Sequence, residues 1–246
     1  NHYLWVTGTS TAACHYSGMF VDRVEKVMSG LSGTMITTPK FAIEVASNDG
    51  TFLRRFQDRG WQVLGVEPAG NIAQAAAADG ISTLPEFFNA NLADDLIRKY
   101  GSADVVVARN VVPHVAEIHS LIEGLAIASG DSGVVVIEVH AAEVILSDLH
   151  YDSIYHEHLF YFSLQTLCDL CERHGLHPFD VFDSPINGGS SVVFFSQQGR
   201  PWSKRLREAT DQSRHAEVDS HDHWLEFADA SKQHAEALKE VVSEYS

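Results

Sequence analysis

Short apolar runs alternate with amphipathic segments along the first half of the chain. Four runs rich in Val, Ile and Leu predict strands: 41–46, 61–67, 103–108 and 133–139. The intervening segments predict helices, most of them ending on a glycine: 51–60, 71–80, 89–101 and 117–130. Strands that alternate with helices predict a parallel sheet with helices on both faces, because nearly continuous apolar strands need both faces covered.

The pattern changes after residue 160. A predicted helix over 162–175 is followed by apolar segments at 177–183 and 190–196, which flank a turn rich in glycine and read as an antiparallel strand pair. A mainly parallel sheet that ends in such a pair is the plan of class I methyltransferases. We therefore predict an α/β fold with this Rossmann-like sheet, flanked by helices.

The helical segments at the two ends lie outside this plan. We predict a helical lead-in over 1–38, with Thr9 or Ser10 as its N-cap, a methyltransferase core over 39–198, and a helical extension over 199–246 that breaks near 212–222. The first residue is Asn1, and we expect the chain to be part of a longer protein. Neither a signal-peptide pattern nor an apolar stretch of roughly 18 residues is evident, so the expected setting is the cytoplasm.

Composition narrows the function. The 246 residues carry a formal net charge of −16 with His neutral, which argues against a nucleic-acid partner because phosphates need a basic face. A small anionic substrate needs only a local cationic pocket and stays compatible. The three cysteines do not form a disulfide framework, and Cys168 and Cys171 read as ordinary residues of a helix. The oligomeric state stays open.

The segment Glu44–Phe52 joins the first predicted strand to the first predicted helix. Ligands of open α/β sheets bind at the carboxyl ends of strands, so this loop is a candidate cofactor site. A dinucleotide fold would carry G-x-G-x-x-G here, whereas this loop has Ala46, Asn48 and Gly50 at alternate positions. Small residues next to polar groups suit S-adenosylmethionine (SAM), whose methionine part lies close to the backbone. The alternative is a plain tight turn.

An acid at the end of the second predicted strand supports the SAM interpretation. Glu67 is placed to accept hydrogen bonds from both ribose hydroxyls, where an NADP enzyme would tend to carry a basic residue. The alternative is an exposed acid. We expect these residues to contact the cofactor: Glu44, Ala46, Ser47, Asn48, Gly50, Glu67, Pro68 and Asn110.

Two polar clusters follow predicted strands and are candidates for catalysis. Arg109, Asn110 and His114 come directly after the strand at 103–108, near the carboxyl edge of the sheet. The alternative roles are structural: His114 would cap the next helix and Asn110 would make a turn.

The second cluster is His150–Ser163, in which Tyr155, His156, Glu157 and His158 are consecutive. One interpretation is a zinc site with the two His, but nothing completes the ligand set, and we expect no metal. A second is a structural role that ties the loop to the sheet. Acid/base chemistry fits best, because a His oriented by a neighbouring carboxylate accepts a proton near neutral pH.

Six segments carry a resemblance to a known family: HYLWVTGTS, EVASNDGTF, VLGVEP, ARNVVPHV, DSIYHEHLFYFS and INGGSSVVF. They resemble, in order, the sugar C-methyltransferases that act on nucleotide-linked keto-deoxysugars in natural-product biosynthesis. The resemblance extends to about residue 196. In that family a cysteine-rich zinc module precedes the methyltransferase core and further sequence follows it.

The resemblance implies roles for the two clusters. Asn110 and His114 would lie beside the substrate, and Tyr155, Glu157 and His158 would supply acid/base and positioning groups. His158 is the expected base, which removes a proton next to a ketone while Glu157 orients it or shares the work. Asn110, His114 or Tyr155 would hydrogen-bond the developing enolate oxygen. SAM would then donate the methyl group to carbon.

Substrate contacts are expected at Tyr3, His156 and Asn187. Two positions depart from the family pattern: Asn187 stands where the family usually has His, which leaves the substrate open, and Ala46 stands where it often has Gly. The basic residues of 200–207 would reach a substrate pyrophosphate or form a solvated helix face.

Other functions remain open from the sequence. They are an O- or N-methyltransferase of a small metabolite, a C-methyltransferase of a carrier-bound β-keto acyl chain, an NAD-dependent oxidoreductase, and an inactive SAM-fold module.

Overall fold

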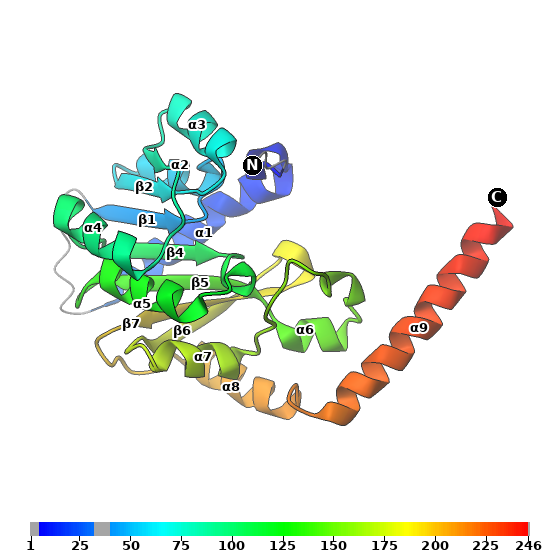
Figure 1. The fold of residues 1–246 in the computed structure, drawn as a ribbon. Coiled ribbons are helices and arrows are strands. Elements are labelled where there is room, and N and C mark those ends of the chain that lie inside the picture. Colours follow the sequence, from blue (N-terminus) through cyan, green and yellow to red (C-terminus); the bar gives the residue numbers. More distant parts are fainter. Residues whose placement is uncertain (1–4, 32–39, 246) are drawn as a thin grey trace.

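A seven-stranded sheet with the order β3-β2-β1-β4-β5-β7-β6 organises the protein. The computed structural model describes residues 5–31 and 40–245 (Figure 1). The strands are β1 (Phe41–Val45), β2 (Gln62–Val66), β3 (Thr83–Leu84), β4 (Val105–Arg109), β5 (Val134–His140), β6 (His177–Ser184) and β7 (Ser190–Ser196). β7 runs antiparallel to both of its neighbours, β5 and β6, and the other pairings are parallel. The predicted class I methyltransferase fold is confirmed.

The described part of the chain contains nine helices. They are α1 (Thr11–Ser29), α2 (Thr51–Gln57), α3 (Gly70–Ala78), α4 (Ala90–Tyr100), α5 (Ile118–Ser129), α6 (Ala142–Ser147), α7 (Leu164–Glu172), α8 (Lys204–His215) and α9 (His221–Glu244). Every predicted helix is present, and the predicted break separates α8 from α9. The pattern did not indicate β3 or α6, since both are short. Among the described residues, no helix has the length and apolarity needed to cross a membrane.

The two faces of the sheet are covered by different helices. Because side chains alternate along a strand, Ala42 and Val107 pack with α1 and α2 on one face. Ile43 and Val106 pack with α4, α5 and α7 on the other. Each face buries a large apolar cluster, which explains why β1, β4 and β5 are apolar at nearly every position.

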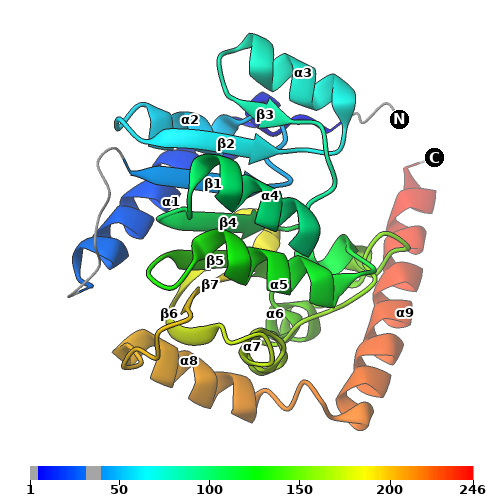
Figure 2. The same ribbon diagram turned by 60° about the vertical axis from the view of Figure 1, so that its left-hand side comes forward.

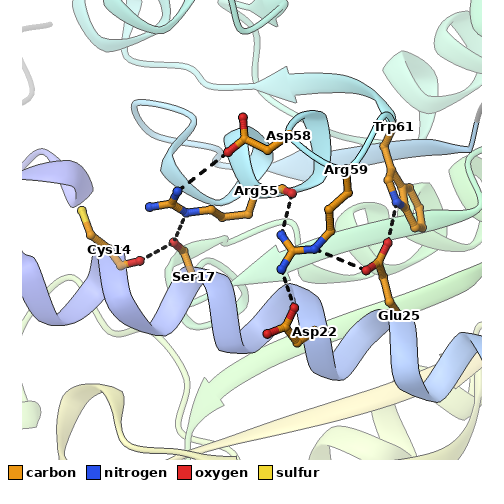
Figure 3. A network of polar contacts seen from close by, with 8 residues as sticks. All are labelled: Cys14, Ser17, Asp22, Glu25, Arg55, Asp58, Arg59 and Trp61. Carbon is orange, nitrogen blue, oxygen red and sulfur yellow. Dashed lines mark hydrogen bonds and ion pairs between the residues drawn. The ribbon is translucent and has the colours of Figure 1, made fainter.

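A network of polar contacts holds α1 against α2 and the turn that follows it (Figure 3). The guanidinium of Arg59 forms ion pairs with Asp22 and Glu25 of α1, with 3.3 Å between Arg59 Nε and Glu25 Oε2. One turn earlier, Arg55 Nε donates to Ser17 Oγ at 3.0 Å. These contacts therefore fix α1 along α2 and the turn that leads to β2.

The start of α1 follows the sequence signal closely. Ser10 is its N-cap, and Ser10 Oγ accepts a hydrogen bond of 3.2 Å from Ala13 N. A single turn, η1 (Thr7–Thr9), precedes it. Three further turns of this kind lie in loops: η2 (Val112–His114), η3 (Tyr151–Ser153) and η4 (Ile186–Gly188).

The end of the chain extends away from the sheet. Figures 1 and 2 show α9 as a long helix that leaves the layered body after α8. Phe227 is buried near its start, whereas residues 232–245 are exposed. A contact of 2.9 Å between Tyr151 Oη and His234 Nδ1 joins α9 to η3.

Candidate active site

The loop after β1 has an unusual backbone. Ala46, Asn48 and Gly50 have φ values of 53°, 51° and 77°, so all three lie in the left-handed region. A Cβ atom at Gly50 would lie 3.0 Å from side-chain atoms of Ile81, which leaves no room for a larger residue. The alternation of small and amide residues in the sequence thus reflects a tight turn at the carboxyl end of β1.

Glu67 connects this loop to the end of β2. Its Oε2 accepts a hydrogen bond of 2.9 Å from Asn48 N, and its Oε1 accepts one of 2.9 Å from Ala69 N. The side chain is 5% exposed, so the carboxylate is held at the edge of the sheet. Each carboxylate oxygen keeps a further lone pair, which can accept a hydroxyl donor. Pro68, the next residue, is exposed beside it.

Two other residues of the loop direct their side chains away from this edge. Asn48 Oδ1 accepts from Thr7 N at 2.9 Å, and Asn48 Nδ2 donates to Trp5 O at 3.1 Å. The amide of Asn48 therefore fastens the lead-in segment to the loop. Ser47 lies against β2, because a Cβ atom at Gly65 would meet Ser47 Oγ at 2.4 Å.

A buried charge cluster lies under the loop. Arg109, the last residue of β4, contacts Glu138 Oε2 at 2.7 Å and Glu44 Oε1 at 3.7 Å. Its guanidinium carbon is 3.3 Å from the ring centre of Phe52. Two carboxylates thus share one guanidinium, and within the described residues Glu44 Oε2 and Glu138 Oε1 have no hydrogen-bond partner.

The shared guanidinium does not compensate both acids. Burial raises the pKa of Glu44 to about 8, although Arg109 opposes the shift. Burial and the nearby carboxylate of Glu138 also raise the pKa of Tyr16 in α1. Glu44 therefore keeps a proton at neutral pH, and a cation that bound at its free oxygen would replace that proton.

The two polar clusters of the sequence meet at a group of tilted rings that pack against one another. The ring of His158 lies 4.3 Å from that of Tyr155 and 4.8 Å from that of His114, centre to centre. His158 Nδ1 is 2.8 Å from the carbonyl oxygen of Ser153, and His114 Nδ1 is 2.9 Å from the carbonyl oxygen of Glu157. Main-chain carbonyls therefore orient both rings, where a neighbouring carboxylate was expected to orient His158.

Main-chain contacts hold the two clusters together. Leu159 N and Phe160 N both donate to Pro113 O, at 2.8 and 3.3 Å. Asn110 adopts a left-handed φ of 49°, and its main-chain N–H donates a hydrogen bond of 2.8 Å to the carbonyl oxygen of Glu138. The predicted catalytic residues are thus brought to the carboxyl edge of β4 and β5.

These contacts define which ring nitrogen is basic. A carbonyl oxygen only accepts, so in the neutral rings Nδ1 of His114 and of His158 carries the proton and Nε2 carries the lone pair. Burial lowers the pKa of His114, against the opposing effect of the Glu157 carbonyl. His114 is therefore predominantly neutral at pH 7.

The remaining expected residues are less defined. Tyr3 lies outside the described residues, and so does the side chain of Asn187, whose backbone is part of η4. His156 and Glu157 are exposed. In the described part of the chain, no three His, Cys, Asp or Glu residues form a group that could hold a metal ion.

The basic cluster of 200–207 does not lie at this edge, which favours the solvated helix face over contact with a substrate pyrophosphate. Arg205 pairs with Asp180 and donates to Val181 O at 3.1 Å. Asp180 is level with Val136 through β7, four residues before the end of β5 and so about 13 Å from it. Lys204 pairs with Glu208 along α8 at 3.2 Å. Lys204 and Arg205 are therefore paired with neighbouring acids.

The two cysteines of α7 behave as core residues. Cys168 and Cys171 are both buried as free thiols. Burial raises the pKa of Cys168 to about 12 and that of Cys171 well above its usual value. Neither thiol is therefore reactive at neutral pH.

Sequence reasoning missed several polar residues at the site. Glu138 and His140 interrupt the apolar strand β5, and Ser153 lies in the loop that follows. A charged residue inside a strand that is buried on both faces is a signal for a buried ion pair, and it would have indicated Glu138. No comparable signal marks Ser153.

Comparison with known proteins identifies the family. A family model described as a methyltransferase domain matches residues 24–179. The C-methyltransferase NovU of Streptomyces niveus is 32% identical over 193 residues, which cover 78% of this chain and 44% of NovU. The chain thus spans less than half the length of this relative.

Solved structures show the same fold. A SAM-dependent methyltransferase from Archaeoglobus fulgidus superposes with a TM-score of 0.54 at 14% identity, covering 73% of this chain and 93% of that one. Magnesium protoporphyrin IX methyltransferase from Synechocystis PCC 6803, solved with bound SAM, gives 0.50 at 10% identity, covering 79% and 85%.

The residues at the carboxyl edge of β1 and β2 fit this cofactor. The free oxygen of buried Glu44 suits the ammonium group of SAM. Glu67 presents acceptors that suit ribose hydroxyls. The chain belongs to the methyltransferase domain family: it is a SAM-dependent methyltransferase domain, and SAM is its cofactor.

Proposed function

We propose that this domain methylates a carbon atom of a nucleotide-linked keto-deoxysugar through an enolate. The observation that carries the proposal is the orientation of His158, whose Nδ1 is held by the carbonyl of Ser153 so that Nε2 is the basic nitrogen. A methyltransferase acting on a hydroxyl or amine needs only one base near the acceptor, and it does not need hydrogen-bond donors for an oxyanion. The name of NovU, a C-methyltransferase, supports the same chemistry.

Proton removal is the first step. His158 Nε2 takes a proton from the carbon next to the substrate ketone, and the electron pair of that C–H bond moves onto the carbonyl oxygen. The imidazolium that forms keeps its Nδ1–H on the Ser153 carbonyl, which stabilises the added charge.

The enolate oxygen needs hydrogen-bond donors. Neutral His114 offers a lone pair at Nε2, so it is a poor donor, and its ring instead packs against His158. The amide of Asn110 and the hydroxyl of Tyr155 are the better donors, and one donor of this kind contributes about 100- to 1000-fold in rate. The left-handed turn at Asn110 sets the direction of that side chain.

The cofactor is held by the opposite part of the edge. Glu44 and Glu67 would bind its ammonium and ribose portions, and the left-handed loop that ends at Gly50 would lie against its methionine part. SAM supplies an electrophilic methyl group, which the enolate carbon accepts with release of S-adenosylhomocysteine.

Solvent exchange tests the proposal. The protein is incubated in heavy water with nucleotide-linked keto-deoxysugars, without and with SAM, and the sugar is followed by mass spectrometry. We expect deuterium uptake at carbon without SAM and a methyl group on carbon with SAM.

Variants assign the chemistry to residues. His158→Ala should suppress both signals by at least about 100-fold, whereas His119→Ala, a surface substitution in α5, should leave both unchanged. Methyl transfer to oxygen without exchange at carbon would exclude C-methylation, and turnover of a β-keto thioester but no sugar would exclude the sugar substrate.

A further inference from the structure

His140, the last residue of β5, uses both ring nitrogens in contacts with the loop that precedes Tyr155 and His158. Its Nε2 is 3.2 Å from His150 Nδ1, and its Nδ1 is 3.3 Å from Ser153 Oγ. The side chain is only 9% exposed. His150 is the N-cap of η3 and Ser153 is its last residue, so one imidazole contacts both ends of this turn.

The turn η3 depends on these contacts for its place on the sheet. Within the turn, Ser153 N donates to His150 O at 3.0 Å, and Leu149 enters it with a left-handed φ of 58°. Gly188 of η4 also packs against His150, since a Cβ atom added to Gly188 would lie 2.7 Å from His150 Cε1. His140 therefore links η3 directly to the last residue of the central strand β5.

The end of η3 is also the group that orients His158. The carbonyl oxygen of Ser153 lies 2.8 Å from His158 Nδ1, so the position of this carbonyl sets both the tilt of the ring and its tautomer. Partners one step removed from a reacting imidazole control its orientation and basicity in this way.

We infer that His140 is a positioning residue for the proposed base: through Ser153, it aims Nε2 of His158 at the substrate carbon. The inference rests on the proposed function, which makes His158 the base. It adds that β5 contributes to proton removal by a route that includes no substrate contact.

The surroundings of His140 suit this role. Burial lowers its pKa, and the nearby His150 and His158 lower it further, against a weaker effect of Asp152. A neutral imidazole donates one hydrogen bond and accepts one, as contacts with a hydroxyl and a second imidazole require. The rings that face His158 itself belong to His114, Tyr155 and Tyr161.

Three variants and one control test the inference. Ser153→Ala removes only the hydroxyl that contacts His140, Ser153→Thr keeps a hydroxyl, and His140→Ala removes the ring. His174→Ala is the control, because His119 and His174 form a second imidazole pair on the surface, with ring centres 5.2 Å apart against 5.3 Å for His140 and His150.

Two measurements are made on each folded variant. Carbon exchange in heavy water gives kcat and KM as functions of pH, and nitrogen-15 NMR of the imidazoles gives the tautomer of His158. We expect Ser153→Ala and His140→Ala to lower kcat about 10- to 100-fold with KM changed less than about 3-fold. Both should turn the Nδ1–H form of His158 into a mixture, and Ser153→Thr and His174→Ala should match the wild type.

The NMR measurement keeps the inference separate from the proposed function. If no sugar exchanges, the proposed function fails, while a tautomer of His158 that still depends on Ser153 and His140 upholds the positioning contact. An unchanged tautomer and an unchanged pH profile in folded Ser153→Ala would overturn the inference, even with full activity on the sugar. Should His140→Ala fail to fold, Ser153→Ala alone decides.

Discussion

The main-chain amide of Asn48 donates a hydrogen bond of 2.9 Å to Glu67 Oε2. This contact joins the loop after β1 to the end of β2, the two parts of the edge that fit SAM. The acid is thus oriented before a ligand arrives, which lowers the entropy lost on binding.

Glu67→Gln should weaken SAM binding by about 10- to 100-fold. A glutamine side chain has one acceptor oxygen, so its amide nitrogen would face one of the two amides that Glu67 now accepts from, Asn48 N or Ala69 N. The same conflict should lower the free energy of unfolding by about 1–3 kcal/mol. Calorimetric titration with SAM and urea denaturation measure the two effects. Exposed Glu86→Gln is the control, and equal affinities in the two variants would contradict the assignment.

Ala46→Gly should stabilise the fold by about 1 kcal/mol. A left-handed conformation costs an alanine about 1–2 kcal/mol, and glycine avoids most of that cost. Ala75→Gly, at an exposed position in the interior of helix α3, is the matched control. It should destabilise the fold by about 1 kcal/mol, because glycine is a poorer helix former than alanine. Thermal denaturation of both variants checks the opposite signs, and two losses of stability would show that Ala46 is not strained.

Stability should fall as pH rises from about 4.5 towards 8. Burial raises the pKa of Glu44 from its usual 4.5 to about 8, so in this window the folded protein keeps a proton that the unfolded chain has released. One such group contributes a slope of at most about 1.4 kcal/mol per pH unit, which disappears above about pH 8. Urea denaturation between pH 5 and 9 measures it. Glu44→Gln should remove this part of the slope, and an identical slope in the variant would contradict the raised pKa.

Arg109→Met should destabilise the fold by about 3–5 kcal/mol. The substitution leaves the buried acid Glu138 without its cation, and it removes the cation that opposes the raised pKa of Glu44. Adding Glu138→Gln should recover part of the loss, because the uncompensated acid at this position is then removed. Arg98→Met, which breaks an exposed pair with Asp95, is the control and should leave the denaturation midpoint unchanged. A midpoint for Arg109→Met equal to that of the control would exclude a shared buried charge.

Local patterns predicted most of the fold because they act over a few residues. The period of apolar positions, the glycines that end helices and the N-cap at Ser10 each depend on near neighbours in the chain. The short elements β3 and α6 escaped prediction, since two and six residues are too few to establish a period. The left-handed loop from Ala46 to Gly50 was visible as an order of small residues, although its φ values were not.

The sequence by itself determined the fold class, the assignment as a SAM-dependent methyltransferase domain and the position of the polar clusters after strands. Only the tertiary structure decided which groups orient them, because those contacts join residues far apart in the chain: Arg109 meets Glu44 and Glu138, and His114 meets the carbonyl of Glu157. A carbonyl contact depends on where the backbone lies and not on the side chain of the residue that supplies it. For that physical reason, no pattern of residue types could show that Ser153 orients His158.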